Sequence, residues 1–394
     1  MRGNTTRRWV LGIAGVVLVA LLAFFLLAPG IVERQQNRVV PVPLRITPLA
    51  RALADGTADM HADSLLWQRD LDKRSSRGQV DVPRLIAGGY ALQVFSSVTK
   101  TPKHQNYDAN RGDTDNITLL TIAQAQPPRT WRSLLERSLW HADKLDRFAA
   151  ASGGRLRVVR TPADLDRLLA ERARGRRIVG GMLSIEGLQD LEGDIRNLDR
   201  LHAAGFRMAG FAHFFDNDVA GSMHGVAKGG LTPLGVAVLR RMERLGMIVD
   251  VAHASHAAVA DMLRLARRPL VSSHGGVQAT CRVNRNLTDE EVRGIAATGG
   301  VVGIGYWDAA VCSTEPAAVA AAIAHVRDLV GIDHVGLGSD FDGAVTTGFD
   351  ATGVPAVAQA LFDRGFTPDE VRKVMGGNVL RLIRAGIVPL QPAP

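Results

Sequence analysis

Short runs rich in aliphatic and β-branched residues alternate with longer segments of helical periodicity from about residue 50 onward. Strands that alternate with helices are typical of βαβ units, in which neighbouring strands run parallel. Eight β-rich runs occur, at Gly56–Asp63, Tyr90–Val98, Ile178–Glu186, Arg207–His213, Met247–His253, Pro269–His274, Gly300–Tyr306 and His334–Asp340. Eight such units in about 340 residues predict a (β/α)8 barrel of the TIM type with some insertions.

Helix-like segments lie between these runs and complete the α/β pattern. They are Trp131–Ala151, Pro162–Arg174, Asp194–Ala204, Pro233–Leu245, Ala257–Ala266, Asp289–Ala297, Pro316–Val330 and Thr367–Ile383. The alternative architecture is an open, doubly wound sheet. Such a sheet often carries a glycine-rich phosphate loop after its first strand, and this chain has none there, so we favour the barrel.

Side chains that bind metals or transfer protons end six of the eight runs. His61 and Asp63 are two residues apart in an extended segment, so their side chains point the same way. The full set is His61, Asp63, Glu186, His213, His253, His274 and Asp340. A single histidine in such a run is more often a buried structural residue. In barrels of this type the active site lies at the C-terminal ends of the strands, so the set as a whole predicts one metal-dependent site.

The types of side chain in this set suit a pair of divalent ions. We expect Glu186 to bridge the ions, with His61 and Asp63 on the first and His253 and His274 on the second. Nitrogen and oxygen ligands without cysteine suit zinc, with manganese or cobalt as substitutes. Two ions about 3.5–4 Å apart would share a bridging water or hydroxide and lower its pKa. Asp340 is placed to accept a proton from that water and return it to a leaving amine.

A series of short motifs follows in a fixed order along the soluble part of the chain. They are D-M-H-A-D at 59–63, S-I-E-G at 184–187, A-H-F-F-D-N at 212–217, L-T-P-L-G at 231–235, L-G-M-I-V-D-V-A-H at 245–253, S-S-H at 272–274, N-R-N at 284–286, G-L-G-S-D-F-D-G at 336–343 and G-G-N at 376–378. As an ordered set they resemble the membrane (renal-type) dipeptidase family, peptidase family M19. The resemblance implies a two-zinc (β/α)8 barrel that hydrolyses dipeptides, including dipeptides with a C-terminal D-residue.

The resemblance also implies roles for individual residues. It assigns the metal ligands as above and makes Asp340 the catalytic acid/base. His213 matches a histidine that contacts the substrate and stabilises the tetrahedral oxyanion. Arg285 matches an arginine that grips the free carboxylate of the substrate, a task that suits a guanidinium fork. Without the resemblance, Arg285 reads as a surface-loop arginine beside Arg282.

Two other functions fit parts of the pattern. A binuclear amidohydrolase would act on a lactone, a phosphotriester or a cyclic amide, and such enzymes commonly bridge their metals with a carboxylated lysine. No expected strand ends in lysine, and Glu186 takes the bridging place. A tethered binding protein without catalysis would be expected to lack a ligand, whereas all five ligands and Asp340 are present. We therefore expect a metallo-dipeptidase whose partner is a dipeptide, and leave a homodimer open.

An uncharged run of 20 residues, Trp9–Ala28, follows an N-terminus that carries Arg2, Arg7 and Arg8. As a helix it would be about 30 Å long, enough to cross a bilayer. Basic residues before the run favour a cytoplasmic N-terminus. We therefore expect residues 1–8 in the cytoplasm and 9–28 as a signal anchor. A proline-bearing connector at 29–49 would precede the catalytic domain at 50–394.

In a bacterium this topology makes a single-pass protein of the inner membrane whose catalytic domain faces the periplasm. The run could instead be a cleaved signal peptide or a buried core helix. A signal peptide would be removed and would release the protein into the periplasm. The run is longer than the apolar core of most signal peptides, about 7–15 residues, and no clean cleavage site follows it. A buried core helix is disfavoured because the run has no polar face.

The charge and cysteine content exclude some partners. The formal net charge is +8, but aromatic residues make up only 5% of the chain and no basic run is interleaved with them, so a nucleic-acid partner has little support. The only cysteines, Cys281 and Cys312, exclude a cysteine-based zinc cluster. Both are expected in loops at the mouth of the barrel, where an oxidising periplasm would allow them to pair as a disulfide.

Overall fold

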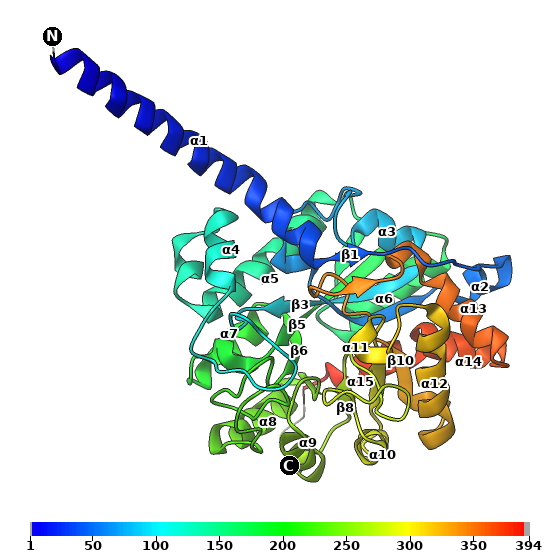
Figure 1. The fold of residues 1–394 in the computed structure, drawn as a ribbon. Helices are drawn as coiled ribbons and strands as arrows, with labels where there is room; N and C mark the ends of the chain where they lie inside the picture. Colours follow the sequence, from blue (N-terminus) through cyan, green and yellow to red (C-terminus); the bar gives the residue numbers. More distant parts are fainter. Residues whose placement is uncertain (1, 390–394) are drawn as a thin grey trace.

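A computed structural model describes residues 2–389, and its main body is a closed parallel barrel (Figure 1). Nine strands form one sheet, and eight of them close in the order β2-β3-β5-β6-β7-β8-β9-β10, with β10 pairing back to β2. Their bounds are β2 Thr57–Ala62, β3 Tyr90–Val98, β5 Val179–Glu186, β6 Phe206–Gly210, β7 Ile248–Asp250, β8 Leu270–Ser272, β9 Val301–Ile304 and β10 Val335–Leu337. The predicted (β/α)8 barrel is confirmed. Seven strands lie within their expected runs, and β6 begins at Phe206, one residue before its run.

Three further strands were not expected. β4, Leu156–Val158, pairs with the first residues of β5, on the edge that β6 occupies from Leu183 onward. β1, Arg38–Val39, and β11, Thr346–Thr347, form a separate two-stranded parallel sheet. This small sheet attaches the segment before the barrel to the loop that follows β10.

Helices surround the barrel, and many begin at a threonine, serine or aspartate cap. Thr161, Thr288 and Thr367 each form a reciprocal capping box with the acidic residue three positions on. The helices are α2 Pro48–Leu53, α3 Val82–Ala87, α4 Ile117–Ala123, α5 Leu134–Ala151, α6 Pro162–Ala173, α7 Arg196–Ala203, α8 Pro233–Leu245, α9 His256–Leu265, α10 Asp289–Ala297, α11 Asp308–Val311, α12 Pro316–Val330, α13 Pro355–Asp363, α14 Pro368–Arg372 and α15 Asn378–Gly386. The expected single helix at 367–383 is instead α14 and α15, joined by a π-helical turn at Lys373–Gly377.

The close approach of that π turn to the first barrel strand accounts for its glycine. A Cβ on Gly376 would lie 2.1 Å from the carbonyl oxygen of Gly56, so only glycine fits there. Beyond the turn, Val379 and Leu382 of α15 join a buried cluster with strand residues such as Met60 and Met182. The C-terminal helix therefore helps to fill the core that supports the strands.

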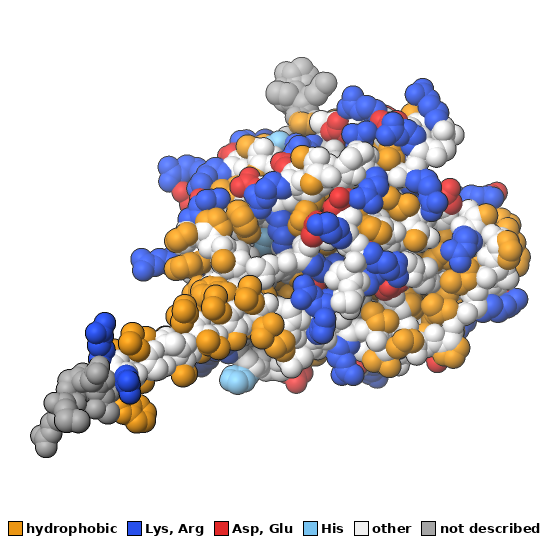
Figure 2. Space-filling view, turned by 90° about the horizontal axis from the view of Figure 1, so that it is seen from above, with side chains coloured by type: hydrophobic (Ala, Val, Ile, Leu, Met, Phe, Trp, Pro, Cys, Tyr) orange, Lys and Arg blue, Asp and Glu red, His pale blue; other side chains and the backbone are white. Residues whose placement is uncertain are grey.

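The N-terminal helix α1, Arg2–Gln36, projects from the barrel (Figure 1). Its residues 7–36 are long and apolar enough to cross a membrane, and apolar side chains cover the projecting part (Figure 2). The helix runs past Ala28, where a connector was expected to begin. After Gln36 the chain is extended and its backbone bonds to residues 347 and 348, before α2 begins at Pro48. The expected connector at 29–49 is thus partly helical and partly fastened to the domain.

Candidate metal centre and active site

The C-terminal ends of the strands bring the predicted polar side chains together. His61 is the next-to-last residue of β2 and Glu186 is the last residue of β5, while the others follow their strands within three residues. All seven side chains are buried: His61, Asp63, Glu186, His213, His253, His274 and Asp340. Arg285, from the loop between β8 and α10, is also buried and not on the surface as its sequence context alone suggested. The structure therefore gathers all eight predicted site residues at one end of the barrel.

Glu186 lies at the centre of the cluster, and its two oxygens face different partners. Oε2 lies 3.6 Å from Nε2 of His61. Oε1 lies 3.5 Å from Nε2 of His213, 3.1 Å from that of His253 and 3.3 Å from that of His274. A carboxylate that faces one group with each oxygen has the arrangement that bridging two cations requires.

Two further carboxylates, those of Asp63 and Asp340, lie near His61. Its Nε2 atom lies 3.4 Å from Oδ1 of Asp63 and 3.9 Å from Oδ1 of Asp340. Ligand atoms of these three residues lie within 4.8 Å of one another, as do those of two further groups that contain Glu186. Three overlapping clusters of this kind form one continuous, acid- and imidazole-lined centre.

The hydrogen bonding of this centre fits cations. Buried polar atoms nearly always have a partner. Yet within residues 2–389, Nε2 of His61 and Oδ1 of Asp63 have no hydrogen-bond partner. The Nε2 atoms of His253 and His274 lie 2.9 Å apart and converge on the same carboxylate oxygen. Imidazole nitrogens and carboxylate oxygens that converge in this way form a donor set that suits zinc and related divalent ions.

Burial and charge set the protonation of these ligands. Burial opposes protonation of His61, but Asp63 and Glu186 outweigh it and hold its pKa well above the usual value. Burial, reinforced by Glu186, raises the pKa of Asp63 to about 6. Burial lowers the pKa values of His253 and His274 well below the usual value. These two imidazoles are therefore neutral at pH 7, the form in which imidazole binds a metal.

Two buried aspartates hold the ends of the strands that carry the ligands, and sequence reasoning missed both. Asp59 accepts hydrogen bonds from the backbone N–H groups of His61 (3.0 Å) and Ser339 (3.1 Å). Asp250 accepts them from Ala252 (3.0 Å) and Ser273 (2.8 Å). Each aspartate thus ties together the ends of two different strands. The sequence feature that could have revealed them is an aspartate inside an apolar run, as in I-V-D-V at 248–251.

Arg285 lies beside the metal-binding cluster. Its Nη2 atom is 3.2 Å from Nε2 of His253, and its guanidinium lies over the ring of Trp307 at 4.7 Å. Its Nε and Nη1 atoms have no hydrogen-bond partner within the described residues. A buried guanidinium with two free donors suits an incoming carboxylate.

A disulfide holds the loop that carries Arg285. Cys281 and Cys312 are bonded, as the sequence predicted, with their Cα atoms 5.4 Å apart. The side-chain amide of Asn286 donates to the backbone carbonyls of Cys281 (2.8 Å) and Ala310 (3.0 Å). The loop after β8 and the segment after β9 are therefore fastened together next to the arginine.

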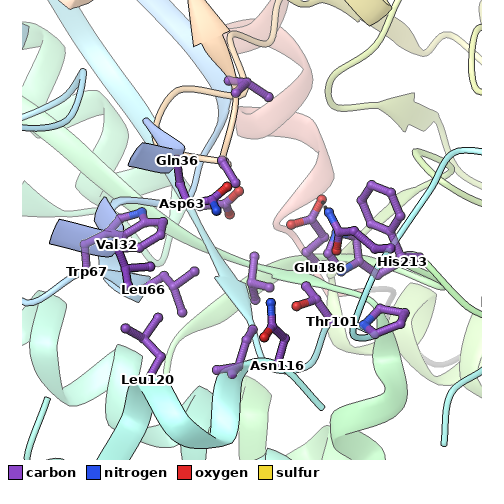
Figure 3. A pocket seen from close by; sticks show the side chains of 18 of the residues that line it. Val32, Gln36, Asp63, Leu66, Trp67, Thr101, Asn116, Leu120, Glu186 and His213 are labelled. Carbon is purple, nitrogen blue, oxygen red and sulfur yellow. Dashed lines mark ion pairs between the residues drawn. The ribbon is translucent and has the colours of Figure 1, made fainter. Parts of the chain in front are cut away.

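The cluster opens into a pocket of about 500 Å³ with two unlike sides. Glu186 and His213 mark the polar side, and Asp63 lies between it and the apolar side (Figure 3). The apolar side is lined by Leu66, Trp67, Val98, Ile117 and Leu120, together with Phe24, Ala28 and Val32 of α1. The helix expected to cross the membrane therefore lines the same pocket as the metal-binding cluster.

Comparisons with known proteins agree with this geometry. Residues 48–387 match the sequence model of the membrane dipeptidases, peptidase family M19. The chain belongs to peptidase family M19. It is a metallopeptidase of the dipeptidase type, and thus a hydrolase.

Relatives described as dipeptidases match most of the chain. Dipeptidase aclJ of Aspergillus oryzae is 30% identical over 391 residues, which span 93% of this chain and 86% of the relative. Dipeptidase tcpJ of Claviceps purpurea is 28% identical over 360 residues, spanning 87% and 79%. Among solved structures, the M19 metallopeptidase called dipeptidase AC superposes with a TM-score of 0.71 at 26% identity, covering 84% of this chain and 99% of that one. A metallopeptidase from Rhodobacter sphaeroides, bound to a phosphinate mimic of L-Ala-D-Ala, gives 0.68 at 27% identity with the same coverage.

Proposed function

We propose that this M19 member is a membrane-anchored zinc dipeptidase that requires a free C-terminal carboxylate and accepts a D-residue at that end. The observation that carries the proposal is the position of Arg285, buried beside a centre in which each oxygen of Glu186 faces a different set of ligands. The Rhodobacter sphaeroides structure, which holds a mimic of a dipeptide with a C-terminal D-residue, supports the choice of substrate.

Two zinc ions fit the donor set. His61 and Asp63 would hold one ion, His253 and His274 the other, and Glu186 would bridge them. When bound, the ions supply Lewis acidity that polarises the scissile carbonyl and makes water more acidic.

The remaining residues handle the proton and the developing charge. Burial raises the pKa of Asp340 well above its usual range, which suits a carboxyl group that takes a proton from the attacking water and gives it to the leaving amine. His213 faces Oε1 of Glu186 and His61 faces Oε2, and His213 lies close enough to the cluster to stabilise the oxyanion of the tetrahedral intermediate.

Arg285 sets the length of the substrate. Its free donors would pair with the terminal carboxylate, and the arginine lies beside His253 at the metal-binding cluster. One residue therefore fits between the scissile bond and the carboxylate. A longer peptide would place an uncharged amide opposite the buried guanidinium, which costs binding free energy.

The test compares free dipeptides with their C-terminal amides. The full chain, purified in detergent with zinc, should cleave both L-L and L-D dipeptides, and amidation should lower kcat/KM by about 100-fold because a charge-assisted bidentate pair is lost. Arg285→Met should remove most of this difference. The exposed neighbour Arg282→Met is the matched control and should behave as the unmodified chain. Equal cleavage of free and amidated dipeptides would overturn the role of Arg285. Cleavage of lactones or phosphotriesters but of no dipeptide would overturn the proposed activity.

A further inference from the structure

The end of α1 is buried against the loop that carries Asp340, although α1 precedes the residues that match the family. Most of the helix is exposed, but Glu33 is only 1% exposed, and Asn37, directly after the helix, is only 4% exposed. Glutamate is seldom buried to this degree without charged partners. Glu33 therefore indicates a specific attachment between the helix and the domain.

A chain of buried ion pairs forms this attachment. Oε1 of Glu33 accepts from Nε of Arg69 at 2.5 Å, and Oε2 lies 3.2 Å from Nε of Arg77. The guanidinium of Arg69 in turn donates to Oδ2 of Asp342 and to the carbonyl oxygen of Val80. Arg69 thus lies between a carboxylate of α1 and a carboxylate two residues from Asp340.

The loop at 340–344 needs such support, because its backbone is strained. Asp340, Asp342 and Ala344 have φ values of 58°, 64° and 60°, in the left-handed region that residues other than glycine rarely adopt. Strain of this kind persists only where surrounding contacts hold it.

The contacts that hold the loop come from both of its sides. Asp342 accepts from the backbone N–H of Gln79 at 2.6 Å, and its carbonyl oxygen accepts from the indole of Trp67 at 2.7 Å. Asn37, which follows α1, accepts from the backbone N–H of Ala344 at 2.9 Å. The N-terminal segment therefore contacts this loop twice, directly through Asn37 and through Arg69 from Glu33.

We propose that Glu33 is a positioning residue of the active site, and that the end of α1 holds Asp340 in its reactive position through Arg69 and Asp342. The proposal rests on the proposed acid/base role of Asp340. It makes the membrane helix a component of the catalytic unit as well as an anchor. Loss of the charge on Glu33 leaves Arg69 with Asp342 as its remaining buried carboxylate, which lets the pair shift and relaxes the strained loop.

The test uses Glu33→Gln in the full chain, with the exposed neighbour Arg34→Gln as the matched control. Glu33→Gln should lower kcat by about 10–100-fold, because small displacements of reacting groups cost that much. KM and the zinc content should stay near those of the unmodified chain. Backbone hydrogen exchange in the peptide at 339–345 should quicken in Glu33→Gln and not in Arg34→Gln.

A second variant keeps the proposal testable if Glu33→Gln does not fold. Asn37→Ala removes only the side-chain hydrogen bond to Ala344. It should also quicken hydrogen exchange at 339–345 and lower kcat. Exchange and kcat that match the control in the folded variants would overturn the proposal, as would a global rise in exchange together with zinc loss. The exchange measurement does not depend on turnover. A chain that cleaves no dipeptide but shows the local exchange change would therefore refute the proposed function and leave the attachment of the loop supported.

Discussion

Asp340 and Asp342 lie two residues apart and have different surroundings. Asp340 faces His61 across 3.9 Å, whereas Asp342 pairs with Arg69. If Asp340 moves the proton, Asp340→Asn should lower kcat by at least about 100-fold, because a general acid/base contributes 100- to 10,000-fold.

Zinc should remain bound in Asp340→Asn, since the amide keeps the size of the side chain and the five expected ligands are unchanged. Metal analysis after dialysis and steady-state kinetics check the two expectations separately. The exposed Asp328→Asn, on α12, is the matched control. Near-normal turnover in Asp340→Asn would show that another group transfers the proton.

The free energy of unfolding should depend on pH through the buried His141 on α5. Its Nδ1 atom lies 2.8 Å from the hydroxyl of Ser97, and burial, aided by Lys144 and Arg137, lowers its pKa to about 3. The unfolded chain binds a proton here below about pH 6.5, but the folded protein does not until about pH 3. The free energy of unfolding should therefore fall as the pH drops through this window, by about 1.4 kcal/mol per unit from this group.

His141→Gln removes the titrating group and keeps a partner for Ser97. The difference in unfolding free energy between pH 7 and pH 4 should therefore be smaller by about 3 kcal/mol in this variant. Urea unfolding at the two pH values measures it. The same difference in variant and unmodified chain would mean that His141 is protonated in the folded protein.

The residues that could be predicted from sequence are those whose position along a strand fixes their place in the barrel. His253 and His274 end their runs, and every strand end meets at one rim, so periodicity sufficed. Arg285 needed the family resemblance, because a loop arginine carries no such geometric information. Asp59 and Asp250 escaped prediction because each also binds a backbone N–H that follows a neighbouring strand, at Ser339 and Ser273, which only the closed barrel brings near.

At the level of elements, long periodic segments were predictable and short ones were not. The eight strands and most of the helices follow from local pattern. β4 has three residues, and β1 and β11 have two each, so their pairing depends on what the fold places beside them. The helical extension of α1 to Gln36 likewise depends on tertiary contact, since Glu33 is buried by Arg69.

The disulfide between Cys281 and Cys312 fastens the loop that carries Arg285, and its removal tests how that loop is held. Cys281 and Cys312 are separated by 31 positions in the sequence. Closing such a loop raises the free energy of the unfolded state by about 3–4 kcal/mol. The double variant Cys281→Ser, Cys312→Ser should lose about that much unfolding free energy in urea. It should also raise KM for dipeptides more than it lowers kcat, because the disulfide fastens the loop of Arg285. A KM equal to that of the unmodified chain would show that Asn286 holds the loop without the disulfide.

At the scale of the whole molecule, α1 extends from the pocket as an apolar helix long enough to cross a membrane. Phe24 and Ala28 line the pocket, and the apolar run that precedes them is exposed along its length. A helix of this composition outside a bilayer would expose a large apolar surface to water. We therefore expect the intact chain to remain in the membrane pellet after an alkaline carbonate wash, with the N-terminal sequence uncleaved by mass spectrometry.

The arginines before the apolar run also predict the orientation of α1 in the membrane, with the N-terminus in the cytoplasm. Single cysteines at Asn4→Cys and Gln35→Cys, placed in a chain with Cys281 and Cys312 changed to serine, flank the apolar run. In bacterial cells with a permeabilised outer membrane, an impermeant maleimide should label Gln35→Cys at once and Asn4→Cys only after the inner membrane is broken. The reverse pattern would place the catalytic domain in the cytoplasm. Labelling of both cysteines before the inner membrane is broken, together with release of the protein by the carbonate wash, would show that the helix does not span the membrane.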